Sequence, residues 1–320
     1  IGDFLLDWVS DAPTVELQTS GSTGAPKRIH MPKSAMVRSA LATGQYLDLL
    51  EGTRALLCLP ARTVAGKMML VRALVMGWKL TLQAPGSKPL EGLETQVDFA
   101  AMVPMQLEAS LADLKGLRMV LVGGAPLSRV FLTRLPEDGT AVYESFGMTE
   151  TASHVALRKL NRVPEGEDPE ACLPPFRVLP GIEIEQDPRG CLVVRAPYLK
   201  GEVLVTNDLV SLESGETFRW LGRADHVVNS GGVKLIPERI EAKIAPLMEH
   251  PFFLTGMPDE TLGEKLVLVV EAPRDASLLE RLRSSADLDR FEVPREVLFS
   301  KGFARTPSGK VNRSRTLENL

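Results

Sequence analysis

The sequence predicts an α/β protein: a large N-terminal α/β domain with a β-rich subdomain, followed by a small mobile C-terminal α+β domain. Up to about residue 125, short apolar segments alternate with segments of helical periodicity, which is typical of a parallel sheet covered by helices. After Ala171, short alternating segments follow one another with turns between them, and from Pro237 helix and strand patterns alternate again. We therefore expect one domain at residues 1–224 and a second at 225–320, with the boundary at Ala224-Asp225.

In the first part of the chain, apolar runs of strand length predict strands, one of which delivers the chain to a loop rich in Ser, Thr and Gly. The expected strands are Val15–Thr19, Ala55–Leu59, Lys79–Gln83, Val97–Val103 and Arg118–Val122. A helix begins near Pro32 and carries Met36, Ala40, Thr43 and Leu47 at helical spacing. A second helix, Gly66–Gly77, is apolar except for Lys67 and Arg72.

In the second part, four short segments with turns between them predict the β-rich subdomain: Gly181–Gln186, Cys191–Arg195, Glu202–Thr206 and Thr217–Leu221. Pro237 then opens a helix with Ile240, Ile244 and Leu247 on one face. The remaining elements are strands at Phe252–Met257, Lys265–Glu271 and Arg295–Lys301 and a helix at Ser277–Ser285.

Composition argues against several classes of protein. The net charge is −4 and no basic tract is present, which disfavours nucleic acid as a partner. The 3 cysteines have no CxxC spacing, so we expect free thiols in a reducing, cytoplasmic environment rather than disulfides or zinc. No apolar run has the length of a membrane span, and no signal-peptide pattern opens the chain.

The loop Thr19-Ser20-Gly21-Ser22-Thr23-Gly24, which continues to Lys27, has the composition of a phosphate-binding loop. Glycines let backbone N–H groups approach a phosphate, hydroxyls add donors, and a lysine adds positive charge. It lacks the spacing of a Walker A loop. A flexible Ser/Gly turn has the same composition, so the loop alone leaves both interpretations open.

Three further segments follow the loop along the chain: 143–150 (YESFGMTE), 221–234 (LGRAD through SGGVK) and 307–313 (PSGKVNR). Together with the loop they resemble the motifs of the acyl-adenylating superfamily, which includes acyl-CoA synthetases and the adenylation domains of peptide synthetases. Relatives of this kind carry a longer region before the phosphate loop. Because the chain begins with Ile1 rather than Met, we expect leading residues to be missing and the protein to be a compact version.

The resemblance implies a reaction in two steps: a carboxylate attacks the α-phosphorus of ATP and releases pyrophosphate, and the thiol of CoA then displaces AMP. It assigns Thr19, Ser20, Gly21, Ser22, Thr23, Gly24 and Lys27 to the leaving phosphates. Glu150 matches the family's Mg²⁺ ligand, and Thr149 beside it a phosphate donor. An acid in the first turn of a helix is the alternative for Glu150.

The resemblance also implies the nucleoside site. Asp208 matches the acid that binds the ribose hydroxyls, although Asn207 stands where the family more often has Gly, and Arg223 matches its arginine partner. The adenine slot is expected from Gly123, Gly124, Ala125, Glu144, Ser145, Phe146 and Gly147.

Lys310 matches the lysine that contacts the carboxylate and α-phosphate during adenylation. Asp225 corresponds to the hinge about which the small domain rotates between the two steps. After that rotation, Gly231, Gly232 and Lys234 are expected to line the channel for the CoA thiol.

For the acid, the short N-terminus and the segments 65–73, 103–107 and 147–158 resemble o-succinylbenzoate–CoA ligases of menaquinone synthesis. That acid has a second carboxylate that needs a cation or donors when buried. Arg72 is the first candidate and Lys67 the second, with Ser153 and His154 as donors. A snorkelling Arg or Lys and a core histidine are the structural alternatives.

The sequence therefore predicts an AMP-forming acid–thiol ligase with ATP, Mg²⁺ and CoA. Ligases for another aryl or short acyl acid, a domain that loads a carrier protein, and a nucleotide-binding relative without catalysis are the alternatives. Intact Lys27, Glu150, Asp208, Arg223 and Lys310 argue against the last of these.

Overall fold

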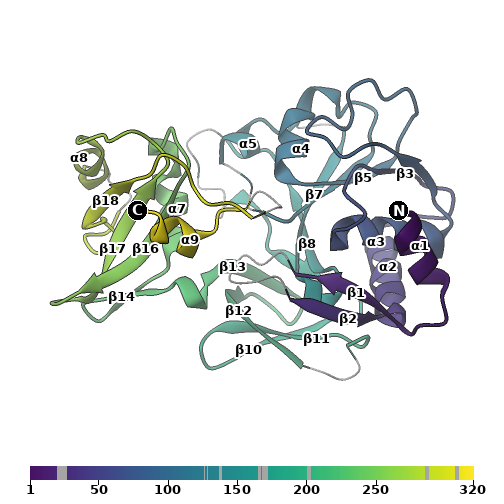
Figure 1. Cartoon of the computed structure of the whole chain (residues 1–320), viewed down its shortest axis with the longest axis horizontal. Helices are drawn as coiled ribbons and strands as arrows, with labels where there is room; N and C mark the ends of the chain where they lie inside the picture. Colours follow the sequence, from purple (N-terminus) through teal and green to yellow (C-terminus); the bar gives the residue numbers. More distant parts are fainter. Residues whose placement is uncertain are drawn as a thin grey trace.

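The computed structural model describes residues 1–19, 27–125, 127, 129–136, 139–164, 167, 172–199, 203–284, 288–306 and 310–320. The protein is mixed α/β: the described residues form a larger and a smaller sheet in separate parts of the molecule, and a two-stranded hairpin (Figure 1). Among the described helices, none has the length and apolar character to cross a membrane.

Within the described residues, the larger sheet has 11 strands in the order β10-β11-β12-β13-β9-β8-β7-β6-β5-β3-β4. Its parallel half consists of β3 (Arg54–Leu57), β4 (Lys79–Leu82), β5 (Phe99–Met102), β6 (Met119–Val122) and β7 (Ala141–Gly147). Its antiparallel half consists of β8 (His154–Leu160), β9 (Phe176–Val178), β10 (Glu183–Gln186), β11 (Cys191–Arg195), β12 (Val203–Leu212) and β13 (Thr217–Arg223). The expected β-rich subdomain is therefore continuous with the parallel sheet.

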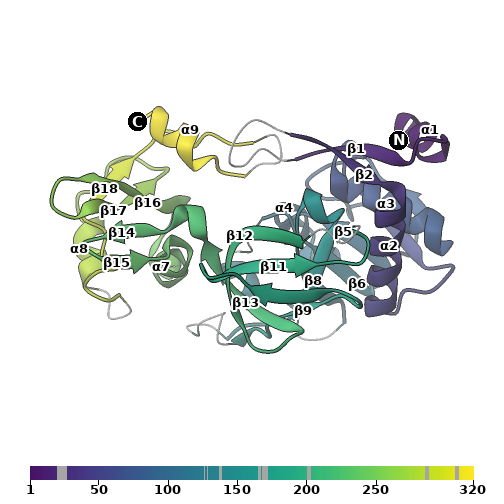
Figure 2. The same ribbon diagram turned by 90° about the horizontal axis from the view of Figure 1, so that it is seen from below.

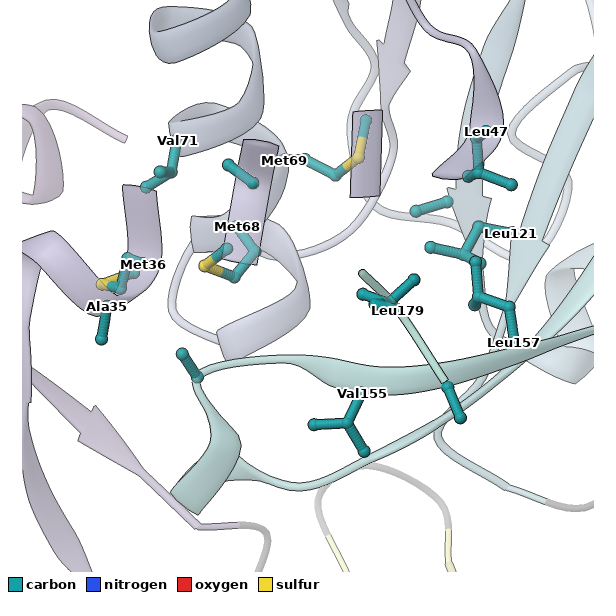
Figure 3. Close-up of a cluster of buried hydrophobic side chains, with 14 of the residues drawn as sticks. Ala35, Met36, Leu47, Met68, Met69, Val71, Leu121, Val155, Leu157 and Leu179 are labelled. Atoms are coloured by element: carbon teal, nitrogen blue, oxygen red, sulfur yellow. The ribbon is translucent and has the colours of Figure 1, made fainter. Parts of the chain in front are cut away.

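Alternation along the parallel strands builds two apolar layers, because successive side chains of a strand point to opposite faces. Ala55, Leu57 and Leu121 join the cluster under α2 (Lys33–Leu47) and α3 (Val64–Met76). Leu56 and Val120 join the opposite cluster, under α4 (Pro104–Ala109) and α5 (Arg129–Thr133). Figure 3 shows part of the first cluster, in which side chains of both helices lie on the same side of the sheet as Leu121 and Leu157, with Leu47 of α2 beside Leu121.

Capping residues define both ends of helix α3. Thr63 caps the N-terminus, its side chain accepting a hydrogen bond from the Gly66 N–H at 3.2 Å. Gly77 ends the helix with φ +66°, a left-handed conformation that glycine adopts without strain. These two ends fix the direction of the helix over the sheet, and with it the position of Arg72.

The N-terminal segment adds α1 (Gly2–Val9) and a hairpin of β1 (Thr14–Gln18) and β2 (Arg28–Pro32). Short 3-10 turns η1 (Leu111–Asp113), η2 (Thr149–Thr151), η3 (Ala224–His226) and η4 (Ala245–Leu247) connect other elements. Turn η3 contains the proposed boundary at Ala224-Asp225, and each apolar cluster lies wholly before or wholly after it.

The smaller sheet contains β14 (Val228–Ser230), β15 (Val233–Leu235), β16 (Phe252–Asp259), β17 (Gly263–Val270) and β18 (Glu296–Phe299). Helices α7 (Pro237–Ile244) and α8 (Leu278–Arg283) cover one face, and Phe303 packs with Phe253 on the other, where α9 (Arg313–Glu318) lies. The expectation that Leu247 shares the buried face of α7 is wrong, since the helix stops at Ile244 and Leu247 is exposed.

Candidate active site

The β1–β2 hairpin holds the two ends of the predicted phosphate loop together. The Thr19 N–H donates to the Lys27 carbonyl at 2.9 Å, and the Lys27 N–H donates to Thr19 Oγ1 at 2.9 Å. Lys27 is exposed. Ser20, Gly21, Ser22, Thr23 and Gly24 lie outside the described residues.

Turn η2 lies against β2, which brings Thr149 and Glu150 close to this hairpin. Thr151 is buried and locks the turn: its hydroxyl lies 2.6 Å from the Ser153 carbonyl and accepts the Met148 N–H at 3.1 Å. The turn closes through Ala152, which has φ +62°. Glu150 is left exposed and has no ion pair within the described part of the chain.

The Glu150 carboxylate fits a Mg²⁺ site of the kind that ATP completes. Mg²⁺ in nucleotide enzymes usually takes one or two carboxylates and fills its remaining positions with phosphate oxygens and water. Among the described residues, no cluster of three His, Cys, Asp or Glu side chains could hold a metal without such help. A bound Mg²⁺ would neutralise phosphate charge, and Glu150 would hold it.

Gly147 sets the spacing between β7 and the turn after η2. A Cβ there would lie 2.4 Å from both the His154 Cα and the Ser153 carbonyl oxygen. We expect Gly147→Ala to cost about 1–3 kcal/mol of unfolding free energy, because backbone must move. We expect its activity to fall with it. Thermal denaturation and turnover measure both effects.

Gly215 offers a matched control for that substitution. It is exposed, and a Cβ there would meet no atom within 4 Å. Gly215→Ala should leave stability and turnover unchanged. Equal behaviour of the two variants would contradict the assigned role of Gly147.

Asp208 and Arg223 face each other across β12 and β13, as the ribose assignment requires. Arg223 Nη1 lies 3.5 Å from Asp208 Oδ2, and its Nε and Nη2 donate to both oxygens of Asp225 at 2.9 and 3.0 Å. The Trp220 indole donates to Asp208 Oδ1 at 2.9 Å. Burial raises the pKa of the Asp208 carboxyl, while the Trp220 and Arg223 donors oppose that shift.

We expect Trp220→Phe to raise the KM for ATP about tenfold, because Asp208 loses a buried donor worth about 1–3 kcal/mol. Steady-state kinetics with varied ATP measure this change. Trp78→Phe is the matched control, since the Trp78 indole N–H is buried without a hydrogen-bond partner in the described structure. An unchanged KM for ATP in Trp220→Phe would show that Trp220 does not contribute to ATP binding.

Lys310 lies in the same region as Arg223. Its own N–H donates to Thr306 Oγ1 at 3.1 Å, and its carbonyl accepts the Thr306 N–H at 2.8 Å. Burial, and then the charge of Arg223, lower the pKa of the Lys310 ammonium. Figures 1 and 2 show the segment before α9 reaching from the smaller sheet toward the end of the β1–β2 hairpin.

The predicted adenine slot has close backbone contacts at the ends of β6 and β7. Ser145 Oγ donates to the Val122 carbonyl at 3.1 Å, and a Cβ on Gly123 would lie 2.1 Å from that hydroxyl. Gly124 has φ +92°. A glycine at each of these positions would let a flat base lie against the backbone, and the assignment to adenine stays a prediction.

Two side chains assigned to that slot have other partners. Glu144 Oε2 accepts from Arg158 Nε at 2.7 Å. The Phe146 ring packs against Phe218 and Phe176, with ring centroids 5.1 and 5.8 Å apart. Their side chains therefore support the slot from the sheet.

Gly231 and Gly232 form the turn between β14 and β15, with φ +58° and +84°, and Lys234 on β15 is exposed. The hairpin pairs with β17. The assignment of these residues to the CoA channel stays a prediction.

Arg72, Ser153 and His154 are brought together from α3 and the start of β8, as predicted. Arg72 Nη2 donates to Ser153 Oγ at 2.9 Å and lies 3.5 Å from His154 Nδ1. Arg72 is 2% exposed, and no carboxylate among the described residues pairs with it. Burial lowers the pKa of its guanidinium to about 10, so it stays charged at neutral pH.

Lys67 does not join this cluster, and its assignment to the acid-binding site stays a prediction. Its Nζ donates to the Glu16 carbonyl at 2.6 Å and lies 5.6 Å from the centre of the Phe4 ring. The helical turn explains the difference, because residues five positions apart face different directions.

Thr43, Thr151 and Trp220 support the candidate site, and no motif in the sequence predicted a role for them. Thr43 carried a weak signal, since it is a hydroxyl residue within the apolar stripe of α2. No local pattern marks Trp220, because its partner Asp208 is on a different strand.

Comparison with known proteins identifies the family. The profile described as "AMP-binding enzyme" matches residues 9–212, more than half of the chain. The chain belongs to the AMP-binding enzyme family. A solved acyl-CoA synthetase (AMP-forming)/AMP-acid ligase II-like protein from Dyadobacter fermentans is 40% identical, covers 99% of this chain and 92% of its own, and has a TM-score of 0.63.

Other members of the family with specific names are more distant. A protein of Mycobacterium tuberculosis described as a probable 2-succinylbenzoate–CoA ligase is 29% identical over 96% of this chain and 84% of its own length. The o-succinylbenzoate coenzyme A synthetase of Bacillus subtilis, solved with ATP and magnesium ion, is 22% identical, with a TM-score of 0.80 over 96% of this chain and 70% of its own. At that identity the likeness concerns the fold.

Proposed function

We propose that this AMP-binding enzyme is a cytoplasmic ligase that converts o-succinylbenzoate to o-succinylbenzoyl-CoA with ATP, Mg²⁺ and CoA. The observation that carries the proposal is Arg72, a buried guanidinium that no carboxylate of the described chain neutralises. A buried charge without a partner is costly, so a protein that keeps one usually needs it for a ligand. The second carboxylate of this acid supplies the missing charge.

The reaction proceeds in two balanced steps. An oxygen of the succinyl carboxylate bonds to the α-phosphorus of ATP as the bond to pyrophosphate breaks, which leaves acyl-AMP. The CoA thiol then loses its proton to solvent, its sulfur bonds to the acyl carbon, and the bond from that carbon to the phosphate oxygen of AMP breaks, so that AMP leaves. Repulsion between anions opposes the first step, and the proposed roles of Lys27 and Lys310 are to offset that repulsion.

The position of Ser153 supports the placement of the acid. Ser153 is half-buried, whereas Arg72 is buried, so Ser153 is the most accessible residue of this cluster, and it lies three residues after Glu150. An acid whose second carboxylate meets Arg72 and Ser153 therefore extends toward the side of the turn that carries Thr149 and Glu150. In the proposed complex, its succinyl carboxylate faces the α-phosphate.

The test is ATP- and CoA-dependent turnover with o-succinylbenzoate, compared with benzoate and short fatty acids. We expect kcat/KM for o-succinylbenzoate to exceed the others clearly, with pyrophosphate released in each productive turnover. Preference for a simpler acid would agree with the proposed ligase reaction but contradict o-succinylbenzoate as the substrate. Adenylation without transfer to CoA would indicate a carrier-loading domain, and no pyrophosphate with any acid would indicate a relative without catalysis.

A further inference from the structure

A chain of polar contacts runs through the apolar layer behind Arg72, from α2 to α3. Thr43 on α2 is fully buried, and its Oγ1 lies 3.0 Å from His154 Nε2. The other ring nitrogen, Nδ1, lies 3.5 Å from Arg72 Nη2 and 3.3 Å from Ser153 Oγ. His154 is 5% exposed.

The proton on the imidazole can be placed from both ends of this chain. Thr43 has one hydroxyl proton, and it donates that proton to the Ser39 carbonyl at 2.9 Å. Its contact with His154 therefore requires an Nε2–H donor. At the other end a guanidinium only donates, so Nδ1 must carry a lone pair. Both arguments give the neutral Nε2–H tautomer.

The electrostatic surroundings agree with a neutral ring. Burial, and then the charge of Arg72, lower the pKa of His154 well below its usual value. A neutral ring differs from a carboxylate as a partner for Arg72, because it accepts a hydrogen bond without cancelling the positive charge. A carboxylate in its place would form a buried ion pair that the substrate would have to disrupt.

We propose that Thr43 and His154 are positioning residues: Thr43 fixes the Nε2–H tautomer of His154, whose Nδ1 orients the Arg72 guanidinium while leaving its charge for an anionic group of the ligand. That the ligand is the second carboxylate of the acid rests on the function proposed above. With the Nδ1–H tautomer, two donors would face each other and Arg72 would lose this acceptor.

The tautomer can be measured without any substrate. Long-range ¹H–¹⁵N correlation spectra of ¹⁵N-histidine-labelled protein distinguish the two neutral forms, and the chain has only 4 histidines. The His154 signals are those lost in His154→Gln. We expect the Nε2–H form at pH 7, and an Nδ1–H or protonated ring in the wild type would overturn the proposal.

Thr43→Val removes the hydroxyl with little change of shape, and Thr43→Ser retains it. We expect Thr43→Val to populate the Nδ1–H tautomer in part, because a buried Nε2–H then lacks its acceptor while the long Arg72 contact still favours a lone pair on Nδ1. We expect Thr43→Ser to behave as wild type. Thr53→Val is the matched control, because the buried Thr53 hydroxyl donates only to the Leu50 carbonyl, at 2.7 Å. An unchanged tautomer in folded Thr43→Val would also overturn the proposal. If that variant does not fold, the wild-type spectrum and Thr43→Ser decide.

Kinetics test the consequence for the acid. We expect Thr43→Val to raise the KM for o-succinylbenzoate about tenfold, since hydrogen bonds to charged groups are worth about 1.5–3 kcal/mol. We expect kcat and the KM for ATP to change less than about threefold, and Thr43→Ser to restore the KM. A uniform loss with every substrate would indicate a merely structural role and overturn the proposal. If wild type does not use o-succinylbenzoate, the proposed function fails, while the spectra still decide this inference.

Discussion

Replacing Lys310 with alanine is expected to abolish acyl-AMP formation while leaving thioester formation from supplied acyl-AMP largely intact. The Lys310 ammonium lies near Arg223, the residue assigned to the ribose by resemblance, and burial lowers the pKa of Lys310. We expect a half-buried cation in that position to stabilise the negative charge that develops on the carboxylate and α-phosphate during adenylation. Removal of one such group typically costs about 10²–10³ in rate.

The two half-reactions can be measured separately. Acid-dependent exchange of pyrophosphate into ATP reports adenylation, and CoA consumption with synthetic acyl-AMP reports transfer. Lys301→Ala, in the same part of the chain and exposed, is the matched control and should affect neither. Equal loss of both half-reactions in Lys310→Ala would contradict the assignment of Lys310.

The separate effects of Lys310→Ala on the two half-reactions also test the proposed rotation about Asp225. In the present structure Asp225 holds Arg223 through two hydrogen bonds, at 2.9 and 3.0 Å. If the small domain rotates between the steps, Lys310 leaves the site and the Gly231-Gly232 turn replaces it. Thioester formation then proceeds without Lys310, which is the reason for the expected asymmetry.

Short continuous apolar runs and segments with apolar residues at helical spacing could be predicted from the sequence as strands and helices. The strands β3, β5 and β6 and the helices α2 and α3 were found within a few residues of their ends. The helix α1, the strand β2 and the long β8 were missed. Strand β8 has neither a continuous apolar run nor regular alternation, because Arg158 and Lys159 interrupt its apolar residues.

The continuity of the large sheet could not be predicted, because it depends on pairing between distant segments. Strand β9 joins β8 to β13 through Phe176, Arg177 and Val178, which have no local signal of such a role. The site shows the same limit. Motif residues such as Asp208 and Arg223 were identified by resemblance, whereas Thr43 gains meaning only when α2 packs beside His154.

Substitution of Arg72 tests whether the buried cluster of Arg72, Ser153 and His154 serves the reaction or only the fold. We expect Arg72→Met to lower kcat/KM for o-succinylbenzoate by a factor that corresponds to about 2–5 kcal/mol of lost transition-state stabilisation, the usual cost of leaving a buried charge unpaired. Acids without a second carboxylate should lose little. Arg72→Lys keeps the charge but not the planar fork, so only partial recovery is expected. Arg38→Ala, an exposed arginine on α2, is the matched control.

Stability should move in the opposite direction to activity. Arg72 is charged, buried and without a carboxylate partner among the described residues, and its Nε has no hydrogen bond. Replacement of a buried charge by an apolar side chain of similar size is often neutral or stabilising. We therefore expect the melting temperature of Arg72→Met to equal or exceed that of wild type. A clear fall in melting temperature would mean that Arg72 serves the fold, and its link to the acid would then lack its main physical argument.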